Sequence, residues 1–240
     1  MRVKPFVVAH RGAHAGQRSL ENTLVAFQRA IDAGYDCIET DLRLTKDKTW
    51  ICCHDPQIAG LSVAKTSFFQ LRAAAEQMGI VICSLEECLS LHSRIHLDLE
   101  IKVPGYEEHL WSILSSIPIE HYVIKSFHRS CLLSLRELSV DVRLGILWTR
   151  RKWLSLFKSV PRDSEKQVLQ AFISEIKPQF ISLELSAVDA MVFELIRNVG
   201  VELWPWTVRS KEQTRALIDL GVEAVVTDVP EYVASLTASS

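Results

Sequence analysis

The stretch that decides the fold runs from Val7 to Pro56 and reads VVAHRGAHAGQRSLENTLVAFQRAIDAGYDCIETDLRLTKDKTWICCHDP. Two short apolar runs lie near its ends, FVVA at residues 6–9 and WICC at residues 50–53. Apolar runs of this length, bounded by loop residues, are typical of buried strands. The first run is followed by His10 and the second by His54, so both histidines are expected at the ends of strands.

A further strand is expected between these runs, at residues 37–44. Side chains along a strand alternate between its two faces, so Glu39 and Asp41 point the same way. The stretch thus places two histidines, two carboxylates that share a face, and Arg11 at strand ends. This combination indicates a reacting centre rather than a packing motif.

Strand and helix patterns alternate along the rest of the chain. Such alternation predicts parallel strands that are joined by right-handed crossovers. Eight of these units within 240 residues predict an α/β fold, a closed (β/α)8 barrel of the TIM type that forms a single domain over residues 1–240. The main strands are expected at residues 3–9, 37–44, 96–102, 122–126, 142–148, 180–185, 201–208 and 223–227.

The helices follow from apolar residues at helical spacing and from capping residues. Ser19 or Asn22 is expected to cap the first helix. A short insertion at about residues 55–83, which starts with a loop at residues 57–65, is expected after the second strand. Helices are expected at residues 24–34, 67–78, from 84 onward, 106–116, 130–138, 163–176, 188–198, 211–220 and from 230 onward.

In barrels of this type the reacting groups lie at the C-terminal ends of the strands. Glu39, Asp41 and Glu100 are expected to converge there, and their mutual repulsion raises at least one pKa unless a cation is bound. Ligands that offer only oxygen indicate one Mg²⁺ or Ca²⁺ rather than zinc. The alternative is that each carboxylate pairs with a neighbouring Arg or Lys.

Histidine is the side chain whose ordinary pKa lies nearest neutral pH, so His10 and His54 suit general acid–base work on a phosphate ester. One of them would activate the nucleophile and the other would protonate the leaving oxygen. Arg11 is expected to bind two phosphate oxygens through its planar guanidinium group. Lys102 is expected to bind phosphate through the point charge of its ammonium group. The alternative for His54 is a turn-capping pair with Asp55.

The composition limits the class of protein. The chain carries 27 Lys+Arg against 29 Asp+Glu, for a net charge of -2, whereas a general nucleic-acid binder usually has a basic excess. The six cysteines show no CxxC spacing and are expected as free thiols in a reducing compartment. No apolar run has the length of a signal-peptide core or of a membrane span, so a cytoplasmic location is expected and no integral membrane segment. The sequence leaves the oligomeric state unknown.

A series of short motifs spans nearly the whole chain: His10-Arg11-Gly12, Glu21-Asn22-Thr23, Glu39-x-Asp41, Thr45-Lys46-Asp47, His54-Asp55, Ser84-Leu85-Glu86-Glu87, Leu99-Glu100-Ile101-Lys102, Ser126-Phe127, Trp206-Thr207-Val208, Gly221-Val222 and Thr227-Asp228-x-Pro230. Together these motifs resemble the glycerophosphodiester phosphodiesterase family. The resemblance implies a TIM-type barrel and a hydrolase of lipid and glycerol metabolism, which cleaves glycerophosphodiesters to sn-glycerol 3-phosphate and an alcohol.

The resemblance also implies a role for individual residues. It implies acid–base roles for His10 and His54, ligation of one Mg²⁺ or Ca²⁺ by Glu39, Asp41 and Glu100, phosphate contacts by Arg11 and Lys102, and packing of the glycerol moiety against Trp206. Glu21 and Asn22 match supporting residues of the first loop. The implied partner is a small phosphodiester. The nucleophile is either the 2-hydroxyl of the glycerol moiety or water.

The chain departs from the family pattern at four marked positions. Leu20 and Cys83 stand where the family usually has proline, and Lys48 stands where it has glycine. Arg209 follows Trp-Thr-Val, where the family tends to asparagine. The segment between Asp55 and Ser84 is shorter than the family's inserted subdomain, which leaves the head-group preference open.

Two other functions fit the same residues. One is a lysophospholipase D or sphingomyelinase D type of activity, and the other is a catalytically silent barrel that binds phosphate. Among the remaining residues, His14 and His128 lie near the mouth, and Asp98 is expected to have a buried partner such as Lys125. The basic and aromatic stretch at residues 150–158 is expected to be a solvated loop, with contact to an anionic membrane surface as the alternative.

Overall fold

The computed structural model describes residues 4–149 and 162–237. Its main sheet follows the order β11-β10-β9-β8-β7-β2-β1-β12, and the pairs between neighbours in this order are parallel. The strands span Phe6–Ala9 (β1), Cys37–Leu44 (β2), His96–Ile101 (β7), Tyr122–Ser126 (β8), Leu144–Trp148 (β9), Phe180–Leu183 (β10), Glu202–Leu203 (β11) and Ala224–Thr227 (β12).

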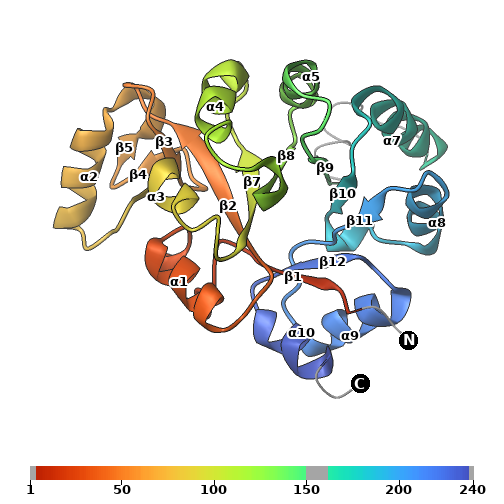
Figure 1. Ribbon diagram of the computed structural model, residues 1–240. Coiled ribbons are helices and arrows are strands. Elements are labelled where there is room, and N and C mark those ends of the chain that lie inside the picture. The colour runs from red at the N-terminus through yellow and green to blue at the C-terminus, as the bar shows by residue number, and fades with distance from the viewer. Residues whose placement is uncertain (1–3, 150–161, 238–240) are drawn as a thin grey trace.

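The sheet closes through the residues that follow β11. Trp206 forms a parallel bridge with Glu184 after β10, and Val208 forms one with Thr227 of β12. This segment therefore continues the short β11 and joins the two ends of the strand order into a ring (Figure 1). The predicted (β/α)8 barrel is confirmed, and its eight strands lie where the sequence predicts them within the described residues.

The helices surround the ring of strands in Figure 1. Their apolar stripes pack against the sheet, whose strands are buried almost continuously, as expected for parallel strands covered by helices. The bounds are Leu24–Asp32 (α1), Phe68–Gln77 (α2), Leu85–Leu89 (α3), Glu107–Leu114 (α4), Arg129–Leu138 (α5), Arg162–Ile176 (α7), Ala190–Asn198 (α8), Lys211–Leu220 (α9) and Pro230–Thr237 (α10).

Between β2 and α3 the chain leaves the ring of strands. β3 (Trp50–Cys52) runs antiparallel to β2 and to β6 (Cys83–Ser84). Between β3 and β6 lie a small hairpin, the 3-10 turn Val63–Lys65 and α2, beyond β2 in Figure 1. The hairpin consists of β4 (Gln57–Ile58) and β5 (Leu61–Ser62).

The expectation of a loop over residues 57–65 is therefore wrong in part, since this segment contains a hairpin and a 3-10 turn. Residues 57–58 pair with residues 61–62 as strands because Ala59 and Gly60 between them both adopt positive φ, 50° and 76°, as a two-residue hairpin turn requires. The sequence signal for such a turn is normally Asn-Gly or Asp-Gly, and alanine in this conformation is not part of it.

The first loop also differs from the expectation. α1 is capped by Thr23, whose side chain accepts a hydrogen bond from the backbone N–H of Ala26, and not by Ser19 or Asn22. Asn22 instead adopts a positive φ of 59° and lies buried. Gly12 holds this loop against α1, because a Cβ at that position would lie 2.8 Å from Cβ of Ala26.

Two expectations lie partly or wholly outside the described residues. The first strand is observed from Phe6, and residues 1–3 are not described. The basic and aromatic stretch at residues 150–158 is not described either. Within the described ranges, no helix combines the length and the apolar character that crossing a bilayer requires.

Candidate active site

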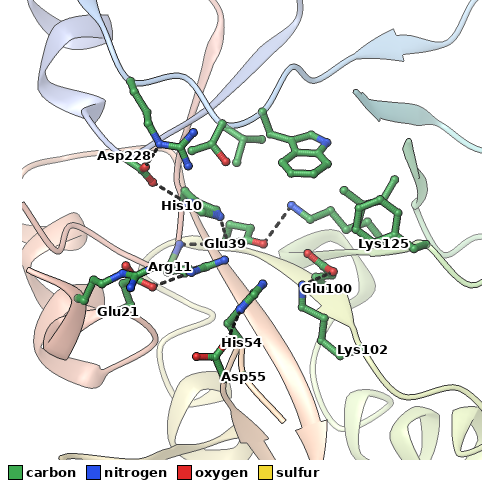
Figure 2. Close-up of a pocket in the computed structure, with 17 residues that line it drawn as sticks. His10, Arg11, Glu21, Glu39, His54, Asp55, Glu100, Lys102, Lys125 and Asp228 are labelled. Carbon is green, nitrogen blue, oxygen red and sulfur yellow. Dashed lines mark hydrogen bonds and ion pairs between the residues drawn. The ribbon is translucent and has the colours of Figure 1, made fainter. Parts of the chain in front are cut away.

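One cavity of about 550 Å³ opens at the C-terminal ends of the strands. Seven of the eight predicted site residues line it, namely His10, Arg11, Glu39, His54, Glu100, Lys102 and Trp206. The eighth, Asp41, is 1% exposed and lies beneath this surface, in contact with Arg11 and Lys102. The structure thus brings all eight residues together at one site, and Figure 2 draws those that line the cavity.

Three carboxylates form a compact cluster at the floor of the cavity. Glu39 and Asp41 come from one face of β2, and Asp41 pairs in register with Glu100 of the neighbouring strand β7. One oxygen from each of the three lies within 4.8 Å of the others, and all three side chains are buried. The alternation within β2 and the register with β7 therefore account for the cluster.

Two cations contact this cluster from the side of Asp41. Lys102 Nζ lies 2.9 Å from Asp41 Oδ1 and also contacts Glu100, and Arg11 Nε lies 3.1 Å from Asp41 Oδ2. Burial would raise the pKa of Asp41, but the charges of Lys102 and Arg11 outweigh burial and hold that pKa well below its usual range. The pairing of carboxylates with Arg and Lys, weighed as the alternative to a metal, is thus present in the structure.

The other two carboxylates differ in their surroundings. Burial, with the charges of Asp41 and Glu39 acting in the same direction, raises the pKa of Glu100 to about 7 although Lys102 opposes the change. Glu39 accepts a hydrogen bond from the backbone N–H of Arg11 at 3.0 Å and lies 3.3 Å from Lys125 Nζ. The cluster therefore contains one carboxylate whose pKa is lowered, Asp41, and one whose pKa is raised, Glu100.

The donor set fits a hard divalent cation. Its ligand atoms are carboxylate oxygens, which suit Mg²⁺, Ca²⁺ or Mn²⁺. The raised pKa of Glu100 reflects the cost of burying three acidic groups together, which a bound cation would relieve. Glu39, Asp41 and Glu100 are the residues that would hold the ion.

Asn22 fixes the orientation of Asp41. Its side-chain amide donates to Asp41 Oδ2 at 3.0 Å, and its oxygen accepts from the backbone N–H of Asp41 at 3.1 Å. Glu21 plays a similar part for Arg11, since Glu21 Oε2 accepts from Arg11 at 2.6 Å. Both residues thus support the site, as the first loop was expected to do.

His10 forms a dyad with Asp228, which follows β12. His10 Nδ1 lies 2.6 Å from Asp228 Oδ1. Burial would raise the pKa of Asp228, but hydrogen bonds from His10 and His14 and the charge of Arg209 lower it below the usual range. Because the ionised carboxylate can only accept, we assign the proton to Nδ1 of His10. The other ring nitrogen, Nε2, lies 3.9 Å from Glu39 Oε2.

His54 stands on the opposite side of the carboxylates from Asp228 (Figure 2). Its Nδ1 lies 2.8 Å from Asp55 Oδ1, and its side chain is 44% exposed. Arg43 Nε donates to the backbone carbonyl of His54 at 2.8 Å and anchors this turn. His54 and Asp55 do form the pair that was weighed as a turn cap, and the pair nevertheless lines the cavity.

The remaining walls of the cavity contain aromatic and charged residues. Trp206 is fixed by a hydrogen bond from its Nε1 to the carbonyl of Ser182 at 2.8 Å, and its ring meets Phe127 edge to face. Lys125 lines the cavity and lies 2.6 Å from Asp98 Oδ2, which confirms the expected pair. Arg18, Arg209 and Asp228 also line the cavity.

Neither of the two histidines expected near the mouth lines the cavity. His14 is buried, and its Nε2 lies 3.6 Å from Asp228 Oδ1. His14 therefore contacts the Asp228 carboxylate of the His10–Asp228 dyad.

Comparisons with known proteins give a consistent result. A sequence profile of the Glycerophosphoryl diester phosphodiesterase family matches residues 10–232. The glycerophosphodiester phosphodiesterase of Caldanaerobacter subterraneus subsp. tengcongensis is 28% identical over 257 residues, covering 98% of this chain and 98% of that protein. The structure of the Thermotoga maritima glycerophosphodiester phosphodiesterase superposes with a TM-score of 0.80 at 22% identity, covering 98% of this chain and 100% of that one. An Oleispira antarctica phosphodiesterase, solved with the product sn-glycerol-3-phosphate, gives 0.78 at 20% identity, covering 98% and 97%.

Proposed function

Because the chain belongs to the glycerophosphoryl diester phosphodiesterase family, we propose that it hydrolyses glycerophosphodiesters to sn-glycerol 3-phosphate and an alcohol. The observation that carries the proposal is the gathering of three buried carboxylates and two histidines at one cavity. The product bound by the Oleispira antarctica phosphodiesterase is the one that this reaction yields.

The two histidines divide the proton transfers. Each presents Nε2 to the cavity, since each has a carboxylate at Nδ1, Asp228 for His10 and Asp55 for His54. One imidazole takes the proton of the attacking hydroxyl or water, and the other gives a proton to the leaving oxygen. The carboxylate at Nδ1 holds each ring in the tautomer that this exchange needs.

A divalent cation held by Glu39, Asp41 and Glu100 supplies Lewis-acid polarisation of the phosphoryl group when it is bound. The chain's own cations complete the phosphate site. Arg11 offers a planar fork, and Lys102 offers a point charge at the cavity wall. The indole of Trp206, fixed through Ser182, offers the apolar face against which the glycerol moiety packs.

The lining favours a polar substrate over an acyl chain. Ten of the seventeen lining residues are acidic or basic, and two more are histidines. An acyl chain of a lysophospholipid would have to lie against charged groups, which disfavours the lysophospholipase D alternative. In a barrel that only binds phosphate, neither histidine would need a carboxylate partner at Nδ1.

The test is a hydrolysis assay on purified protein. The protein is stripped with EDTA and then assayed with glycerophosphoethanolamine after separate addition of Mg²⁺ and Ca²⁺. We expect turnover to require the added cation and to fall at least ~100-fold in His10→Ala and in His54→Ala. His96→Ala is the matched control, since His96 begins β7 at the far end of the barrel and should leave turnover unchanged.

Other outcomes would assign a different function. Turnover of lysophosphatidylcholine in place of glycerophosphoethanolamine would identify a lysophospholipase D. Phosphate binding without turnover of either substrate would identify a silent barrel. Full activity after chelation would contradict the metal requirement.

A further inference from the structure

Two arginines line the cavity without a part in the chemistry proposed above, Arg18 and Arg209. Arg209 directly follows the segment that closes the barrel, and its side chain is 64% exposed. Its Nε donates to Asp228 Oδ2 at 2.8 Å, while its two terminal nitrogens have no partner among the described residues. The guanidinium thus retains free donors at the cavity rim.

Arg18 supplies a second positive charge at this rim. It lies in the 3-10 turn Arg18–Leu20 of the first loop and is exposed. Its side chain makes no hydrogen bond or ion pair with the described part of the chain. The loop that carries Arg18 also carries His14, which contacts Asp228, the partner of Arg209.

The deeper cations of the cavity are already neutralised by carboxylates. Lys102 contacts Asp41 and Glu100, Lys125 contacts Asp98 and Glu39, and Arg11 contacts Glu21 and Asp41. Arg18 is therefore the lining cation that lacks a carboxylate partner in the described residues. Arg18 therefore offers a ligand a positive charge that no carboxylate of the described residues pairs with.

The cavity walls lack the aromatic surfaces that would bind a quaternary ammonium head group. A quaternary ammonium is usually held by a cage of several aromatic faces. The only aromatic residues among the described lining are Phe127 and Trp206, and their rings pack against each other with centroids 5.8 Å apart. These two rings do not form such a cage.

We infer that Arg209 and Arg18 select glycerophosphodiesters whose alcohol part carries an additional anionic group, such as a carboxylate. This inference rests on the proposed function and adds the substrate class. The free guanidinium donors are matched to a carboxylate by charge and by planar geometry.

The test compares two substrates of similar size in one assay, glycerophosphoserine and glycerophosphocholine. We expect the wild-type protein to favour glycerophosphoserine in kcat/KM. Arg209→Asn should reduce the ratio of the two kcat/KM values about fivefold, and Arg18→Gln should act in the same direction. Raising the salt concentration should reduce the wild-type ratio, since exposed charges are screened.

The ratio separates substrate selection from an indirect effect of Arg209 through Asp228. Loss of support for Asp228 would lower both kcat/KM values by the same factor and shift the pH profile, leaving the ratio unchanged. Arg215→Gln is the matched control, because Arg215 is an exposed arginine of α9 that does not line the cavity.

An unchanged ratio in both Arg209→Asn and Arg18→Gln would overturn the inference while leaving the proposed function intact. A wild-type preference for glycerophosphocholine would also overturn it. Absence of turnover on every glycerophosphodiester would instead overturn the proposed function on which it rests.

Discussion

Lys102 Nζ lies 2.9 Å from Oδ1 of Asp41, between two of the three carboxylates that would hold a divalent cation. The ammonium group thus supplies part of the charge that the ion itself would supply. The same side chain lines the cavity where the substrate phosphate is proposed to bind. Cation and ammonium therefore compete for the carboxylates.

We predict that Lys102→Met binds Mg²⁺ or Ca²⁺ about tenfold more tightly than the wild-type protein in the absence of substrate, while its turnover falls. Removal of the ammonium leaves Asp41 and Glu100 without their nearest compensating charge, and a bound cation then relieves more repulsion. Isothermal titration calorimetry of the EDTA-treated protein measures the affinity. Lys46→Met, at an exposed lysine, is the control, and an affinity unchanged from wild type in Lys102→Met would rule out the competition.

We predict that Asp228→Asn lowers kcat by roughly 100- to 1000-fold while the fold is retained. Asparagine keeps the shape of Asp228 but can present an N–H to His10 Nδ1, which disfavours the tautomer with Nε2 as the free base. Steady-state kinetics together with circular dichroism measure the effect. Asp141→Asn, at an exposed aspartate, should have no effect, and equal activity in the two variants would show that Asp228 does not orient His10.

The pH dependence of stability gives a separate prediction for Asp228. The pKa of this carboxyl is lowered in the folded protein, so the unfolded chain binds a proton at a pH where the folded protein does not. Stability from this group is therefore complete above the unfolded pKa of about 3.9 and is lost as pH falls toward the folded pKa.

We expect the free energy of unfolding of the wild-type protein to exceed that of Asp228→Asn by about 2 kcal/mol at pH 7. At pH 3 the difference should be about 1 kcal/mol smaller, because the unfolded chain is then largely protonated at this residue. Urea unfolding at the two pH values measures it. A difference that grows as pH falls would mean that the pKa of Asp228 is raised and not lowered.

The sequence predicts those parts of the site that depend on local rules. Alternation along one strand placed Glu39 and Asp41 on one face, and the barrel hypothesis placed Glu100 at the same end. These three side chains do meet, because β2 and β7 are neighbours in register. Family membership likewise confirms the resemblance that the motifs carried.

The roles that the sequence analysis did not assign, those of Asp228 and Thr23, depend on contacts between distant parts of the chain. Asp228 meets His10 across 218 positions, only because β1 and β12 are neighbours in the closed ring. Thr23 caps α1 because Asn22, the more common type of cap, is turned inward to Asp41. The order of the strands, and not the local sequence pattern, determines these partners.

The buried pair of Asp98 and Lys125 gives the last prediction. Lys125 Nζ lies 2.6 Å from Asp98 Oδ2 and 3.3 Å from Glu39 Oε1, and both Asp98 and Lys125 are at most 1% exposed. Without Asp98, Lys125 keeps only the longer contact with Glu39, and such a loss of compensation for a buried charge costs about 3 kcal/mol. We therefore expect Asp98→Ala to lower the free energy of unfolding by about 3 kcal/mol, as measured by urea unfolding.

Two further variants separate this charge effect from a loss of packing. The double variant Asp98→Leu with Lys125→Met should recover part of the lost stability, because the apolar pair needs no compensation, whereas Glu39 loses its contact with Lys125. Glu175→Gln breaks the exposed pair with Arg129 and should cost less than about 1 kcal/mol. A double variant as unstable as Asp98→Ala would show that the site depends on the volume of these side chains and not on their charges.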